Sequence, residues 1–178
     1  MLRIFFGLGL LALVSACATL DEGECLSANW YEIGLQDGSN GKSASHFSRH
    51  VKACQKHGVI PQQSPWREGR EAGLRLFCVP DRAYQVGRNG NSFPGVCNPA
   101  ETVEMRPAYD WGREYYLIGQ EIAELEAEID NRNDILDDLV DPDDPLFAEY
   151  RYENFRDRSK IRRLERRQEK FAFWPPVF

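Results

Sequence analysis

The three histidines of this chain lie close to one cysteine. His46, His50 and His57 fall within twelve residues and bracket Cys54. On a helix, offsets of four, four and three residues place these side chains on one face. Imidazole nitrogens and a thiolate suit zinc or copper, so a face of this kind could bind a transition metal. The favoured explanation is exposed or helix-capping histidines, because oxidation of Cys54 would remove the thiolate and no carboxylate set stands beside the histidines.

Signatures of an enzyme are absent from the sequence. It has no Gly-x-Ser-x-Gly elbow, no His-Glu-x-x-His zinc helix and no phosphate-binding glycine loop. Asp37, Glu68 and Glu71 lie near aromatic residues and could form the acid and base pair of a glycan-cleaving enzyme. On helices rich in arginine, such acids are more often surface ion pairs. We therefore expect a protein without enzymatic activity.

Four further cysteines indicate the compartment of the protein and its disulfide bonds. Cys25, Cys54, Cys78 and Cys97 are an even set of thiols, which is typical of disulfides in an exported protein. Three pairings are possible. We favour Cys25 with Cys54 and Cys78 with Cys97, because pairing nearest neighbours closes consecutive segments without crossing them. Each bond would stabilise the fold by about 3 to 4 kcal/mol.

The first residues of the chain have the pattern of an export signal. Arg3 precedes an apolar run from Ile4 to Val14, and Ser15 and Ala16 lead into Cys17. The run is too short to cross a bilayer as a helix. It looks like a lipoprotein signal peptide, and we expect Cys17 to carry a thioether-linked diacylglycerol and an amide-linked acyl chain such as palmitate. Two or three chains give durable membrane attachment. The alternative is an ordinary secretory signal.

The net charge of -6 argues against nucleic acid as a partner, because phosphate binding needs a concentrated basic face. We expect the membrane and an envelope protein as partners instead.

Residues 25–110 are rich in glycine and aromatic residues and divide into short helical segments. Capping residues indicate four helix starts, at Ser27, at Ser43 or Ser45, at Ser64-Pro65 and at Asp81. Residues 89–99 have the composition of an irregular loop, and no segment alternates like a strand. The expected fold is therefore all-α.

An aromatic residue precedes a glycine by three positions at five places in the sequence. Close helix packing at the glycines is the favoured explanation. The alternative is that the aromatic rings line a ligand groove. The five segments begin at Tyr31, Trp66, Tyr84, Tyr109 and Tyr116.

The last third of the chain predicts a helical hairpin. Apolar residues from Ile118 to Leu139 keep helical spacing among many acids, and those from Phe147 to Phe171 do so among many arginines. Pro142 must end the first helix. Opposite charges then favour an antiparallel pair around an apolar seam. The alternative is two extended arms, of which the basic one lies on anionic lipid.

These observations divide the chain into five parts. We expect a lipoprotein signal peptide at 1–16, a lipidated tether at 17–24, a disulfide-braced helical domain at 25–110, a hairpin at 111–173 with its turn at 141–145, and a tail at 174–178.

The ordered cysteines and their neighbours resemble a family of uncharacterised bacterial envelope lipoproteins, described only as a domain of unknown function. The resemblance extends from about residue 25 to 119. It is carried by Cys25, Trp30 to Gly34, Asp37-Gly38, His50, Cys54, Gly69, Gly73, Phe77-Cys78, Gly87, Gly90 and Gly95 to Cys97.

The resemblance implies a Gram-negative envelope setting and supplies no activity, cofactor or catalytic residue. Ala18, following the lipidated cysteine, implies sorting to the outer membrane, facing the periplasm. The function we expect is non-enzymatic binding or scaffolding through the 111–173 hairpin. The alternative is a lipoprotein that binds zinc or copper on the face formed by His46, His50, Cys54 and His57.

Overall fold

The computed structural model describes residues 20–93, 95–139, 141 and 143–176. The described residues form helices and no strands, so the expected all-α fold is confirmed. Among these residues, no helix has both the length and the apolar character that crossing a bilayer requires. The predicted signal peptide and the predicted lipid site at Cys17 lie outside the described residues.

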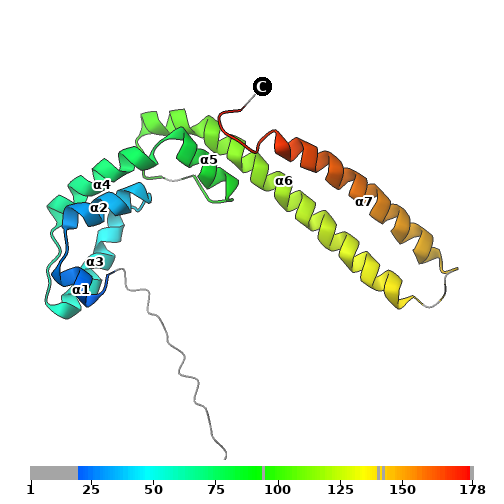
Figure 1. Ribbon diagram of the computed structural model, residues 1–178, viewed down its shortest axis with the longest axis horizontal. Helices are drawn as coiled ribbons and strands as arrows, with labels where there is room; N and C mark the ends of the chain where they lie inside the picture. The colour runs from blue at the N-terminus through cyan, green and yellow to red at the C-terminus, as the bar shows by residue number, and fades with distance from the viewer. Residues whose placement is uncertain (1–19, 94, 140, 142, 177–178) are drawn as a thin grey trace, which may run out of the picture.

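The helices follow one another with short connections. Figure 1 shows α1 to α4 at one end of an elongated molecule, α5 packed on the first turns of α6, and α7 returning beside the rest of α6. The elements are α1 (Glu22–Leu26), α2 (Trp30–Ser39), η1 (Ala44–His46), α3 (Phe47–Cys54), η2 (Gln55–His57), α4 (Gln63–Phe77), α5 (Pro80–Arg88), α6 (Pro99–Asp138) and α7 (Pro145–Glu169).

Several helices begin at residues other than the expected ones. The side chain of Asn29, not Ser27, caps α2 by accepting from the backbone N–H groups of Tyr31 and Glu32. α4 begins at Gln63, before the expected Ser64-Pro65 start. Similarly, α5 begins at Pro80 rather than after Asp81, because proline is well suited to the first helical position.

Both expected disulfides are present, and the favoured pairing is confirmed. Cys25 of α1 bonds to Cys54 at the end of α3, with a Cα–Cα distance of 5.5 Å. Cys78, just after α4, bonds to Cys97 in the connection that precedes α6, with a Cα–Cα distance of 5.7 Å. The first bond therefore joins α1 to the end of α3, and the second joins the end of α4 to the connection before α6.

α2 and α4, the first helix pair, cross at glycines. A Cβ atom at Gly34 would lie 1.9 Å from the carbonyl oxygen of Trp66, and one at Gly69 would lie 1.9 Å from that of Tyr31. These distances leave no room for any side chain, so the two backbones touch. A second glycine in the same kind of contact follows four residues later on each helix, at Gly38 and Gly73.

α5 and the first part of α6, the second helix pair, cross in the same way. A Cβ atom at Gly87 would lie 2.2 Å from the carbonyl oxygen of Tyr109, and one at Gly112 would lie 2.2 Å from that of Tyr84. Four of the five aromatic-x-x-Gly segments thus form two crossings, and the carbonyl of each aromatic residue receives the partner's glycine. At the fifth, Gly119 faces Gln168 of α7. Close helix packing is the confirmed explanation.

The turns that follow α2 and α5 also correspond. Both have the sequence Gln-x-Gly-x-Asn-Gly and matching backbone hydrogen bonds. The last glycine of the first turn, Gly41, has a φ of 68°, and a Cβ atom there would overlap the ring of Phe77. The last glycine of the second turn, Gly90, has a φ of 74°, and a Cβ atom there would overlap the ring of Tyr116. The second helix pair therefore repeats the first. Equivalent positions are Gly38 and Gly87, Gly41 and Gly90, and Gly73 and Gly112.

α6 is one continuous helix of 40 residues that belongs to both parts of the molecule. It begins at Pro99, earlier than the acidic stripe indicated, because Asn98 and Glu101 form a reciprocal capping box. It also passes through Pro107. The expected boundary between residues 110 and 111 consequently falls inside α6.

α6 and α7 form the expected antiparallel hairpin (Figure 1). Its seam is apolar and consists of Ile118, Leu125, Ile129, Ile161 and Leu164, with Ile122 and Phe171 beside it. Opposite charges flank the seam as predicted. Nζ of Lys160 lies 2.7 Å from Oε1 of Glu121, and Nη2 of Arg167 lies 3.2 Å from Oε2 of Glu114.

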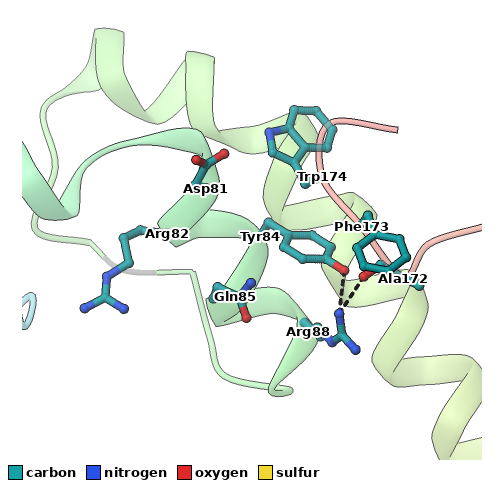
Figure 2. A pocket seen from close by; sticks show the side chains of 8 residues that line it. All are labelled: Asp81, Arg82, Tyr84, Gln85, Arg88, Ala172, Phe173 and Trp174. Atoms are coloured by element: carbon teal, nitrogen blue, oxygen red, sulfur yellow. Dashed lines mark hydrogen bonds between the residues drawn. The ribbon is translucent and has the colours of Figure 1, made fainter. Parts of the chain in front are cut away.

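The chain after α7 binds back onto the second helix pair. Tyr84 donates a 2.9 Å hydrogen bond to the carbonyl oxygen of Phe171. Arg88 donates a hydrogen bond to the carbonyl oxygen of Ala172 (Figure 2). The carbonyls that follow the helix thus find donors on α5. A cavity of about 430 Å³ lies beside this contact, lined by Asp81, Arg82, Tyr84, Gln85, Arg88, Ala172, Phe173 and Trp174.

Candidate functional site

Three polar side chains meet beside the first helix pair. Asp37 lies on α2, His46 ends η1, and His50 lies on α3. Asp37 and His50 are buried, with only 8% and 3% of their surfaces exposed. η1 and α3 belong to the connection between α2 and α4, and the Cys25–Cys54 disulfide holds the end of α3. The histidines are therefore carried by a braced segment.

Asp37 is the centre of the cluster. Its Oδ2 atom accepts a 2.7 Å hydrogen bond from Nε2 of His50 and a 2.8 Å hydrogen bond from Nε1 of Trp66. Its other oxygen, Oδ1, lies 3.7 Å from Nε2 of His46. The two imidazole rings meet edge to face, with centroids 5.1 Å apart. Nδ1 of His50 is buried and has no hydrogen-bond partner among the described residues.

The surroundings favour an ionised carboxylate and a neutral His46. Burial raises the pKa of Asp37, but hydrogen bonds from His50 and Trp66 and the nearby histidine charges outweigh it, so the pKa is lowered. Burial lowers the pKa of His46 more than Asp37 raises it. At neutral pH the site therefore combines an anionic oxygen donor with an imidazole that has a free lone pair.

The second helix pair shows that the fold does not require this cluster. By the correspondence of the glycines, Val86 stands where Asp37 does, and Met105 stands where Trp66 does. Met105 is part of a buried apolar cluster, and Val86 packs against that cluster. One crossing of this type thus has apolar side chains at these two positions, whereas the other buries a carboxylate with polar partners, which is costly unless each is satisfied.

The structure divides the four predicted metal ligands. His46 and His50 come together, but the sulfur of Cys54 is in a disulfide and cannot act as a thiolate. His57 lies 3.8 Å from Glu22 and outside the group formed by Asp37, His46 and His50. The predicted set of four metal ligands is therefore wrong for Cys54 and His57. Cys54 is excluded because its sulfur is oxidised, and His57 lies away from the other two histidines because it follows α3 in η2.

The expectation that no carboxylate accompanies the histidines is also wrong. Asp37 was considered only as an acid near aromatic residues, together with Glu68 and Glu71, which are exposed on α4. A signal was available in the sequence. Asp37 shares the buried face of α2 with Trp30, Gly34 and Gly38, and an acid on such a face needs a partner.

A second group of possible ligands consists of Cys78, Cys97 and Glu101. Because Cys78 and Cys97 are bonded to each other, neither offers a thiolate. Within the described part of the chain, Asp37, His46 and His50 are thus the stronger candidates for binding a metal.

The fold and the site together define a class: a disulfide-braced helical protein with two glycine-mediated helix crossings, one of them carrying an Asp-His-His cluster, and a helical hairpin. Residues 29–114 match the model of the family described as "Protein of unknown function (DUF2799)". The resemblance to an uncharacterised family is thereby confirmed. No curated protein and no solved structure matches the chain.

The matched segment contains both helix crossings and all three residues of the cluster. It ends within α6, so most of the hairpin lies outside it.

Proposed function

We propose that this protein is a lipid-anchored envelope protein with a non-enzymatic binding or scaffolding role. Lipid on Cys17 would hold it to a bacterial membrane, and the sequence pattern favours the periplasmic face of the outer membrane. The hairpin of α6 and α7 would present a surface to an envelope protein.

The observation that carries this proposal is an exposed aromatic surface near the tip of the hairpin. Tyr152 and Phe155 lie three residues apart on α7, and each has 68% of its surface exposed. Large aromatic side chains that remain exposed on a helix are typical of protein interfaces.

A groove of about 540 Å³ adjoins Phe155. Its walls combine apolar side chains with several arginines, a combination enriched at the energetic centres of interfaces. We therefore expect the partner to offer apolar and acidic side chains. The groove is lined by Asn133, Leu136, Asp137, Phe147, Arg151, Asn154, Phe155, Arg158 and Arg162.

The length of α6 suits a scaffolding role. At 1.5 Å per residue, a helix of this size is about 60 Å long. Because the segment after α7 is hydrogen-bonded to α5 and α7 packs along α6, the hairpin can hold a partner at a distance from the disulfide-braced helices.

Site-specific photo-crosslinking in the periplasm tests the partner surface. A photoreactive residue at position 155 should give one or two defined protein adducts, and the same residue at Arg166 is the control, because Arg166 is exposed on α7 outside the groove. The double variant Tyr152→Ser, Phe155→Ser should abolish adducts formed from position 158. Equal yields of adducts from position 155 and from the control position 166, or no adducts from position 155, would contradict the proposal.

Metabolic labelling with radioactive palmitate tests the anchor separately. The wild-type protein should be labelled and recovered with membranes, whereas Cys17→Ser should be unlabelled. An unlabelled wild-type protein would overturn lipid attachment.

A further inference from the structure

We infer that Asp37, His46 and His50 form a binding site for a divalent transition-metal ion, with zinc as the best match. One donor atom from each of the three residues lies within 4.8 Å of the other two. Two imidazole nitrogens and one carboxylate oxygen are a common protein ligand set for zinc, leaving a fourth position for water or another ligand. The inference goes beyond the scaffolding role and is independent of the hairpin.

The distances suit an ion after a small adjustment. Tetrahedral zinc with bonds of about 2.0 to 2.1 Å places its donors roughly 3.3 Å apart. Oδ1 of Asp37 is 3.7 Å from Nε2 of His46, and Oδ2 is 2.7 Å from Nε2 of His50. Rotation of the carboxylate and a slight retreat of His50 would exchange the Asp37–His50 hydrogen bond for metal bonds.

Trp66 would remain as the outer support of the carboxylate. Its Nε1–H donates to Oδ2 of Asp37 from a side chain that is 2% exposed. Hydrogen bonds to a metal-binding carboxylate orient it and improve affinity. His46, whose side chain is 13% exposed, lies at the more open side of the site and would provide the route of entry.

His50 loses little by this exchange. In the described part of the chain its Nδ1 atom has no hydrogen-bond partner, so one ring nitrogen is already unsatisfied. On binding through Nε2, the ring hydrogen would reside on Nδ1, so the number of unsatisfied ring nitrogens would not change.

The comparison of the two helix pairs adds independent support. The connection between α2 and α4 contains η1 and α3, which bring both histidines to Asp37, whereas the connection between α5 and α6 contains no helix among its described residues. In the second helix pair, Val86 of α5 and Met105 of α6 belong to an apolar cluster at the positions equivalent to Asp37 and Trp66. The polar cluster and the helix that completes it therefore occur together.

Zinc titration of the protein from Ala18 onward, purified without a polyhistidine tag, tests the inference. Isothermal titration calorimetry should show one Zn²⁺ bound per chain. His46→Ala should weaken binding at least tenfold, and so should Asp37→Asn. His57→Ala is the matched control, because His57 lies outside the cluster, and its affinity should equal that of the wild type.

Cobalt provides a second readout that does not depend on heat. Co²⁺ bound to this site should give the visible absorption of a tetrahedral ion without a thiolate charge-transfer band, since Cys54 is in a disulfide. The helical circular dichroism of each variant checks its fold, and His46→Gln replaces His46→Ala if the latter unfolds. Absence of stoichiometric Zn²⁺ binding by the wild type, or equal affinity in folded His46 and Asp37 variants, would overturn the inference.

Discussion

Trp66 of α4 and Asp37 of α2 are joined by a 2.8 Å hydrogen bond between two buried side chains. The bond crosses the first helix pair beside its glycines and fixes the carboxylate that both histidines approach. At the equivalent positions of the second helix pair, Met105 and Val86 belong to an apolar cluster instead. The same crossing is therefore used once with a polar cluster and once without it.

Loss of the indole donor should destabilise the first helix pair. Trp66→Phe keeps an aromatic ring but leaves the buried Asp37 carboxylate with one donor fewer. We expect the free energy of unfolding in urea to fall by about 2 kcal/mol. Met105→Leu, at the equivalent position, is the control and should cost about 1 kcal/mol or less. Equal losses would show that the hydrogen bond has no special importance.

A methyl group at the helix crossing should prevent native packing. In Gly34→Ala, the Cβ would overlap the backbone carbonyl of Trp66, and neither rigid helix can yield. We expect a loss of at least about 3 kcal/mol, which thermal unfolding by circular dichroism would measure. In Gly23→Ala the nearest atom is 3.5 Å away, so this helix variant should be neutral or slightly more stable. A folded Gly34→Ala protein of wild-type stability would refute the close contact.

The two disulfides should leave no reactive thiol in the exported protein from Ala18 onward. A thiol count under denaturing, non-reducing conditions should give zero, because Cys25, Cys54, Cys78 and Cys97 are all paired. Replacing either pair with serine should lower the free energy of unfolding by about 3 to 4 kcal/mol, since both closed loops are of moderate length. Detection of free Cys54 would contradict the structure.

The stability of the hairpin should fall in acid. Asp157 of α7 is buried and bonded to Arg132 of α6 and to Arg156. Burial raises the pKa of Asp157, but the hydrogen bonds and charges of the two arginines outweigh it, so the pKa in the folded protein is lowered below 3.8. The ionised carboxylate therefore contributes stability above the unfolded-state pKa, and this contribution is lost as the pH falls through the folded-state value.

Asp157→Asn measures that contribution. At pH 6 we expect the variant to be less stable than the wild type by about 3 kcal/mol, because Arg132 loses its closest buried partner. The difference should shrink as urea unfolding is repeated down to pH 3. Asp110→Asn is the control, since Asp110 is exposed and 4.0 Å from Arg106, and it should change stability by less than about 0.5 kcal/mol. A constant difference across this pH range would contradict the assigned role.

Much of the architecture is local and could be read from the residues. Helical periodicity, the opposite charges of α6 and α7 and the prolines between them predicted the hairpin. The spacing of the cysteines favoured the observed disulfides, and the repeated aromatic-x-x-Gly segments indicated close packing. These features depend on neighbours within a few turns or on simple closure of the chain.

The site was only half predictable. The four-residue spacing of His46 and His50 placed them on one face, but the same spacing wrongly included Cys54, whose state depends on Cys25. The exported signal and the lipid on Cys17 remain predictions.

The sequence by itself determined the helices, the charge-matched hairpin and the pair of histidines, because each follows from local spacing, capping and backbone chemistry. Only the tertiary structure decided that Asp37 joins those histidines and that Trp66 supports it. Both contacts depend on how α2 and α4 cross. Backbone contact at the glycines fixes this crossing between two helices that are far apart in the sequence. Asp37 gains its histidine partner only when α3 packs against α2, because His50 lies on α3.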